Sequence, residues 1–267
     1  MAGRGARVVI LFCVSALSFA PARAQSSPLN GNRLAMSAGL AYSAQRDERA
    51  SSLSYSGVGP FLDLAFTHHS GASLVDVDLA VSSARSTSSI TSDALPFERE
   101  RAAMVRVAYL HRVFGGGPHR STWLLGASTG GELFASDHHF ADPDQRIASY
   151  GLGLFSFGPA VAWELRLGRG ALSTRVDVPV VGLAWRPYAE FRHLRDAERR
   201  VVTLDEMHAA HAAVEYVYPL GARVDASIIY RLSALSVHET QPYARMSQSM
   251  LARLSVRFGR THPDVLP

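Results

Sequence analysis

The chain has 267 residues, of which 19% are charged, and a formal net charge of +4. All 27 basic residues are arginine, they face 23 acids, and there is one cysteine. This balance gives no reason to expect a nucleic acid or another strongly acidic partner.

The first 24 residues are predicted to be an export signal. Arg4 and Arg7 precede a short apolar stretch, and Ala22-Arg23-Ala24 has the A-x-A pattern of a cleavage site. The apolar run of about 13 residues is shorter than the roughly 20 that a membrane-spanning helix needs, so a retained anchor is the weaker alternative. We expect cleavage after Ala24.

Cleavage would remove Cys13, which excludes a disulfide framework and thiolate chemistry in the mature chain. It would also leave 24 arginines against 23 acids, which removes most of the basic character. No Pro/Ser-rich linker divides the remainder. We therefore expect one domain at 25–258, followed by a short tail at 259–267.

Period-two alternation of apolar and polar residues dominates the chain after the export signal. At 73–82 every second residue is apolar, and Asp76 and Asp78 occupy positions between them. A strand places such charges on one face, whereas helical spacing would scatter them. Together with fainter segments, the pattern predicts ten strands, at 33–44, 57–68, 72–83, 101–114, 120–135, 148–167, 170–185, 206–218, 221–235 and 244–258. Changes of parity predict bulges or kinks near 154–155 and near Pro179.

The predicted connections alternate in length. Short ones at 69–71, 115–118, 168–170 and 219–220 oppose longer polar ones such as 45–54, 83–100, 136–147 and 186–205. This is typical of membrane barrels with short periplasmic turns and long external loops. The predicted fold is therefore all-β: an antiparallel, up-and-down transmembrane β-barrel of about ten strands, within a range of 8 to 12.

On these patterns the chain resembles bacterial outer-membrane β-barrel proteins as a class. The last strand, 251–258, is similar to the terminal signal by which such barrels are recognised for insertion, although 259–267 follow it. The resemblance implies a Gram-negative outer membrane, with outer-membrane lipid, lipopolysaccharide and the barrel-insertion machinery as partners. It identifies no external ligand.

A soluble periplasmic β-sandwich or barrel is the alternative, in which the apolar face would point inward. Aromatic residues near one set of strand ends favour the membrane, because they would form an interfacial girdle. The predicted girdle contains Phe66, Trp123, Trp163, Tyr218 and Phe258. A second local alternative is a helix at 203–213, where Thr203 and Glu206 have capping-box spacing. We favour a strand there because Val214, Tyr216 and Tyr218 alternate with Glu215.

Alternation predicts a charged lumen face. The predicted network comprises Asp76, Asp78, Arg106, Arg112, Arg223, Asp225, Arg231, Arg245, Arg253 and Arg257. Asp76 and Asp78 are expected to pair with Arg106 or Arg112 on the neighbouring strand. A charge-paired, closed interior is the favoured interpretation, and a narrow anion-preferring channel or small-solute transporter is the alternative. Ten strands argue against a general porin, which needs about 16.

Metal binding and catalysis have weaker support. Adjacent histidines such as His68 and His69 point to opposite faces of a strand, so we expect no metal site and no cofactor. The strand number resembles that of outer-membrane aspartyl-type barrel proteases, in which acid pairs and an Asp-x-His sit near the external rim. The corresponding groups here are Asp76-x-Asp78 and Glu206-x-His208.

A hydrolase at the external rim is thus the third interpretation, and its candidate groups there are Asp137, His138, Asp205, Glu206, His208, Ser236, His238 and Glu239. The favoured function is a non-enzymatic barrel with a structural or surface-interaction role.

Overall fold

The computed structural model describes residues 29–48, 53–70, 72–88, 97–115, 121–139, 148–186, 198–238 and 242–258. The predicted export signal and the tail at 259–267 lie outside these residues, as does part of each long predicted loop. Within them, no helix is long and apolar enough to cross a membrane.

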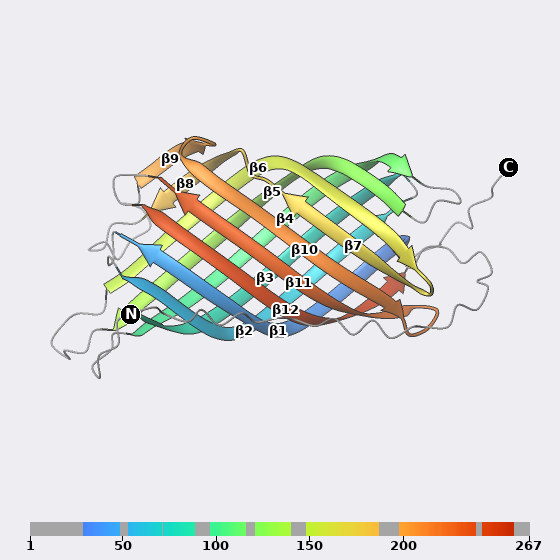
Figure 1. Cartoon of the computed structure of the whole chain (residues 1–267), viewed down its shortest axis with the longest axis horizontal. Coiled ribbons are helices and arrows are strands. Elements are labelled where there is room, and N and C mark those ends of the chain that lie inside the picture. Colours follow the sequence, from blue (N-terminus) through green and yellow to red (C-terminus); the bar gives the residue numbers. More distant parts are fainter. Residues whose placement is uncertain are drawn as a thin grey trace, which may run out of the picture.

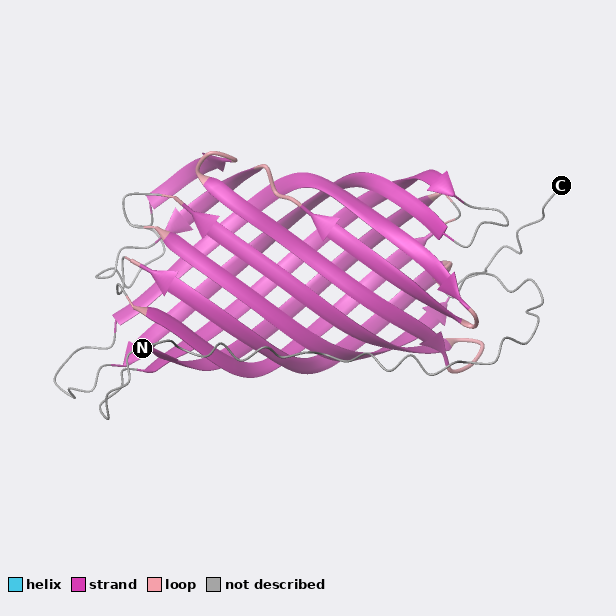
Figure 2. Cartoon of the chain, viewed as in Figure 1, coloured by secondary structure: helices cyan, strands magenta, loops and turns pink. Residues whose placement is uncertain are grey.

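The described residues form twelve strands in one sheet, which closes on itself because β5 pairs with β6. Figure 1 shows the resulting cylinder of diagonal strands, in which β1 lies beside β12, and Figure 2 shows that strands form nearly all of its wall. The strands are β1 (Gly31–Asp47), β2 (Ser54–His69), β3 (Ser73–Ser88), β4 (Phe97–Gly115), β5 (Ser121–His139), β6 (Ala148–Leu167), β7 (Gly170–Asp177), β8 (Val181–Arg186), β9 (Glu198–Thr203), β10 (Met207–Pro219), β11 (Val224–Val237) and β12 (Tyr243–Phe258).

These twelve strands occupy ten positions around the wall. β7 and β8 both pair with β6 and are separated only by 178–180, so they share one position. β9 pairs with β8, and β10 pairs with β7 after the turn at 204–206, so they share another. All pairings are antiparallel, which confirms the predicted fold class and the strand number.

Two local predictions about the strands have different outcomes. The segment at 207–219 is a strand, β10, so the preference over a helix is confirmed. The predicted loop at 186–205 is wrong in part, because 198–203 form β9. Its sequence begins with three charged residues and shows little alternation, which is why the pattern missed it.

The two predicted strand irregularities also have different outcomes. Around Pro179 the inward face changes from odd to even numbers, from Asp177 to Gly182, which confirms the break. The bulge predicted at 154–155 is wrong, since β5 and β6 pair there without a shift of register. A bulge between Arg112 and Phe114 in β4 was not predicted.

The wall has an apolar outer face. Leu40 and Met250 lie opposite each other on β1 and β12 with 62% and 65% of their surface exposed, and the same holds for Met36 and Leu254. An outer face with this much exposed apolar surface is unfavourable in water and is stable in a hydrocarbon environment or against a partner. The apolar face thus points outward, which excludes the soluble alternative in which it would form the core.

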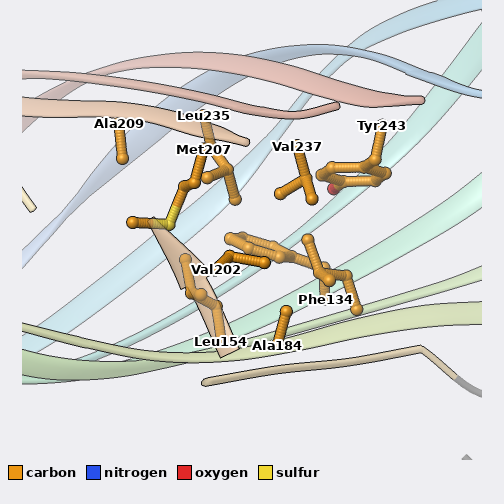
Figure 3. Packing of buried hydrophobic residues seen from close by; sticks show 10 residues of the cluster. Phe134, Leu154, Ala184, Val202, Met207, Ala209, Leu235, Val237 and Tyr243 are labelled. Carbon is orange, nitrogen blue, oxygen red and sulfur yellow. The ribbon is translucent and has the colours of Figure 1, made fainter. Parts of the chain in front are cut away.

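The interior has three layers. The wall has a turn end, where β2 meets β3 and β10 meets β11, and a loop end opposite. An apolar cluster, here called the loop-end cap, fills the interior near the loop end, with side chains converging from many strands (Figure 3): Phe134, Leu152, Leu154, Ala184, Val202, Met207, Ala209, Leu235, Val237 and Tyr243. Smaller apolar clusters, the turn-end caps, contain Leu74, Leu110, Leu124, Ala160 and Ala162, and Leu29, Ala171 and Val217. Most of the charged lumen residues lie between the caps, whereas Asp47, Glu100 and Arg186 lie level with the loop-end cap.

Candidate functional site

The charged layer begins with acids on β2 and β3. Alternation turns Asp63 and Asp78 into the lumen, where they are 2% and 4% exposed. Arg253 on β12 donates from Nη2 to Oδ2 of Asp63 at 2.6 Å, and Arg231 on β11 reaches the same oxygen at 3.2 Å. Arg231 also donates to Oδ1 of Asp78 at 3.3 Å. Each acid is thus held by arginines from other strands of the barrel.

Arg175 on β7 crosses the lumen to the same acids. Its guanidinium bonds to Asp76, donates to Oδ2 of Asp78 at 3.1 Å and lies 3.3 Å from Oδ2 of Asp177. Three strands separate β3 from β7 along the shorter way round the wall. Arg106 on β4 completes this group by donating to Asp177 at 3.2 Å.

Toward the loop end, Glu100 is the centre of a second group. Arg245 on β12 donates to its Oε1 from Nε and Nη2 at 2.9 and 2.6 Å, and Ser43 donates to its Oε2 at 2.5 Å. Arg186 on β8 pairs with Asp47 on β1 at 2.5 Å. Charge-assisted bonds of this kind are what buried guanidinium and carboxylate groups need to offset the loss of hydration.

Two histidines extend the network. His211 Nε2 lies 3.0 Å from Oε1 of Glu132, and its Nδ1 lies 2.9 Å from the Ser233 hydroxyl. His69 Nε2 lies 3.1 Å from Oε2 of Glu164. Among the residues that the structure describes, no group of three or more His, Cys, Asp or Glu side chains is placed to hold a metal ion.

Most predicted network residues do face the lumen. Two details of the prediction are wrong. Arg223 lies in the turn between β10 and β11 and is exposed. Asp78 and Arg106 are neighbours in the β3–β4 ladder, but Arg106 makes its ion pair with Asp177, because the lumen is narrow enough for long side chains to cross it.

Two further residues of the predicted network lie as follows. Arg257 pairs with Asp225 at 3.0 Å near the turn end. Arg112 is half-buried, and its Nε has no hydrogen-bond partner within the described part of the chain. The sequence analysis did not assign Asp47, Glu100, Arg186, His69 and His211 to the charge network. The first three fell within or beside predicted loops, although strict alternation carried three residues further would have included Asp47.

The predicted girdle residues all lie on the outer face near the turn end. Phe66 and Phe258 have ring centroids 6.2 Å apart, and Trp123 and Trp163 are also 6.2 Å apart. Tyr218, at the turn end of β10, is 40% exposed. Aromatic rings with one polar edge prefer this level of a membrane.

Among the described residues, the candidate catalytic groups do not form a single site, and Glu239 lies outside these residues. Asp76 and Asp78 are ion-paired inside the lumen toward the turn end, while Glu206 and His208 lie at the loop end. His208 lies opposite Ser236 in the β10–β11 ladder, and its ring centroid is 4.9 Å from that of His238. His208 and His238 are both exposed on the outer face, away from the acids of the lumen. Glu206 pairs with Arg200, and a hydrogen bond from Thr203 lowers the pKa of Asp205. Asp137 is 3.9 Å from Arg101.

A cavity of about 120 Å³ lies within the charged layer. Its lining combines arginines, acids and serines with small apolar residues, and extends from Leu29 at the turn end to Phe134 at the loop-end cap. A volume of this size admits a few water molecules or a compact small molecule.

Comparison with known proteins identifies the fold but no family. No family model and no curated protein matches the sequence. The structure is similar to the outer membrane protease OmpT from Escherichia coli, with a TM-score of 0.60 and 9% identity over 88% of this chain and 99% of that one. Weaker similarities are to the translocator domain of the autotransporter NalP from Neisseria meningitidis (TM-score 0.48, 8% identity, 86% and 89% covered) and to Neisserial surface protein A (0.37, 10%, 84% and 97%). The fold is that of bacterial outer-membrane β-barrels.

Proposed function

We propose that this chain is a non-enzymatic barrel of the Gram-negative outer membrane whose lumen is closed. The turn end would face the periplasm and the loop end the exterior, as in membrane barrels generally. Its role would then be structural or would lie in surface interactions at the loop end. The same placement makes outer-membrane lipid, lipopolysaccharide and the barrel-insertion machinery its proposed partners.

The closed lumen is supported by the arrangement of its three layers. Ion pairs join side chains across the middle layer, for example between Arg175 and Asp78. At the loop end, Phe134 stacks against Tyr243 with a centroid distance of 6.2 Å and an interplanar angle of 27°. An ion on its way through would have to displace both the paired charges and this apolar layer, which lacks groups to replace its hydration.

The narrow anion channel is less well supported by these contacts. Selectivity for anions needs arginines whose charge is available to a passing ion, whereas Arg175, Arg231, Arg245 and Arg253 are each engaged by carboxylates. A rim hydrolase would require a group of catalytic side chains, and the candidate groups at 76–78 and 206–208 lie apart.

Electrical recording in planar lipid bilayers tests the proposal. The full-length protein, purified from outer membranes, should insert without producing steady conductance steps. Heat-modifiable gel mobility of protein recovered from the same membranes shows that it is folded and inserted, so that an absence of steps reports a closed lumen. Steady anion-selective steps from the unmodified protein would contradict the proposal and would favour the channel.

A further inference from the structure

We propose that three arginines on the outer face of the barrel bind the phosphate groups of lipopolysaccharide. This arginine cluster consists of Arg85 on β3 and of Arg99 and Arg101 on β4, all toward the loop end. The inference rests on the proposed function, because it takes the loop end to face the exterior. It deepens that proposal by giving one of the proposed partners a binding site.

Strand geometry turns the three side chains outward. Glu100 points into the lumen, so Arg99 and Arg101 on either side of it point to the outer face. Arg85 follows Ala84, which is buried in the interior. All three arginines are exposed, Arg101 with 61% of its side chain. They are therefore accessible to the lipid that surrounds the wall.

The arginine cluster concentrates positive charge. Arg85 and Arg99 lie directly opposite each other in the β3–β4 ladder, a position in which like charges destabilise a sheet. Among the described outer-face residues of β2 to β5, Asp137 is the one acid. It lies opposite Arg99, and its Oδ2 is 3.9 Å from Nη2 of Arg101. One carboxylate faces three guanidinium groups, so the patch keeps an excess of positive charge.

The height of the cluster on the wall corresponds to a layer of lipid headgroups. On β4 the outer face runs from Arg101 through the exposed Val105 and Val107 to Phe114, which lies opposite Trp123 of the girdle. These roughly 13 residues, at about 3.3 Å each and a tilt of about 40°, cover about 33 Å along the barrel axis. The apolar band of a membrane barrel is about 25 Å tall, so the arginines lie beyond its edge.

The two ends of the outer face differ in their side chains. The turn end carries aromatic rings, such as those of Phe66, Trp163 and Phe258. Within the described strands, no arginine takes an outward position at that end. Aromatic rings suit a membrane interface in general, whereas clustered basic residues are drawn to anionic headgroups. This difference favours a strongly anionic lipid at the loop end.

Guanidinium groups match phosphate groups in shape and charge. Their planar N–H donors bond two phosphate oxygens at once, and they keep their charge at every pH that a cell surface meets. The phosphates of lipopolysaccharide lie where its acyl chains meet its sugars, which is the level of the cluster. A phosphate between Arg85 and Arg99 would offset their repulsion, so that the lipid and the protein stabilise each other.

Binding of lipid to the full-length protein in excess detergent tests the inference. Diphosphorylated lipopolysaccharide, the same lipid after enzymatic removal of its phosphates, and phosphatidylglycerol are titrated separately onto the immobilised protein. Ionic strength is constant, and EDTA removes divalent cations that would bridge phosphates to the acids. We expect saturable binding of the diphosphorylated lipid, and binding of the other two lipids at least about tenfold weaker. Inorganic phosphate at the same concentration should not displace the lipid.

Variants assign the binding to the cluster. Arg85→Gln, Arg99→Gln and Arg101→Gln should each weaken binding about fivefold, and the triple variant about a hundredfold. Arg46→Gln is the matched control. It removes an outer-face arginine from the same end, but one that pairs with Glu48 at 2.8 Å, and it should change binding less than about twofold. Heat-modifiable gel mobility verifies that each variant is folded.

Three results would overturn the inference. They are equal binding of the dephosphorylated lipid or of phosphatidylglycerol, unchanged binding by the triple variant, and displacement of the lipid by an equal concentration of inorganic phosphate. The last result would assign the cluster to a free anion. None of these results depends on whether the lumen conducts. Steady conductance steps would overturn the proposed function alone, and a failure of lipid binding would leave the closed barrel in place.

Discussion

Arg245 on β12 and Glu100 on β4 form an ion pair across the lumen, and the same arginine lies over the ring of Phe134, with its Cζ 4.4 Å from the ring centroid. The pair is 2.6 Å long, and Glu100 is 2% exposed. Arg245 therefore connects the charged layer to the loop-end cap. Both layers that are proposed to close the lumen therefore depend on Arg245.

Breaking this pair should destabilise the barrel strongly. Arg245→Met leaves the carboxylate of Glu100 buried and uncompensated, which should lower the free energy of unfolding by about 3 to 5 kcal/mol. Adding Glu100→Gln should recover much of the loss, because the unpaired charge is then gone. Urea titration followed by heat-modifiable gel mobility measures both. Additive losses in the double variant would show that the two residues do not act as a pair.

The loop-end cap should also contribute measurably to stability. Phe134→Ala removes a side chain that contacts both Tyr243 and Arg245, so we expect the free energy of unfolding to fall by about 3 to 5 kcal/mol. Phe134→Leu keeps much of the volume and should cost less. Equal, negligible losses in both variants would mean that the cap is not packed as described.

The sequence predicts the strands of the barrel wall better than the side-chain contacts inside the lumen. Alternation identifies the strands because one face meets apolar surroundings all along the barrel, and a period of two follows from strand geometry. Near the loop end the rule weakens: Leu152 and Leu154 point into the cap while Phe155 and Phe157 point outward, so both faces are apolar. That is why the sequence predicted a bulge at 154–155 that does not exist.

Pairing inside the lumen is harder to predict because it depends on closure. The residues facing Asp76 and Asp78 in the ladder are on β2 and β4, but their arginine partners come from β7, β11 and β12. Alternation shows which side chains point inward; it does not show how far they lie apart across the barrel.

A charged side chain on the outer face should lower the free energy of unfolding, and the loss should be larger at the middle of the barrel wall than near its ends. Met250→Arg places a cation in the middle of β12, on the apolar face, and should lower the free energy of unfolding in lipid by about 2 to 4 kcal/mol. Leu204→Arg, in the exposed turn between β9 and β10, should cost about 1 kcal/mol or less. Unfolding in lipid vesicles is the measurement. Equal costs at both positions would contradict a membrane-spanning outer face.

Gly153 should be sensitive to a single methyl group. It faces Trp185 across the β6–β8 ladder, and a Cβ at this position would lie 1.8 Å from Cε2 of the indole. Gly153→Ala must therefore displace the ring, with an expected loss of about 1 kcal/mol. Tryptophan fluorescence in a Trp123→Phe, Trp163→Phe background reports the ring directly. An unchanged emission spectrum would mean that the ring does not cover this glycine.

Accessibility of the lumen to a bulky reagent is the most direct test of closure. The described residues contain no cysteine, so Ser249→Cys in a chain carrying Cys13→Ala introduces a single thiol at a buried position lining the cavity. Arg223→Cys, in the exposed turn, is the control for reagent activity. The native barrel should leave the thiol at 249 unlabelled by a sulfonated fluorescent maleimide, and label it only after unfolding, while the control is labelled in both states. Labelling of the native protein at 249 as fast as at 223 would show that the lumen is open.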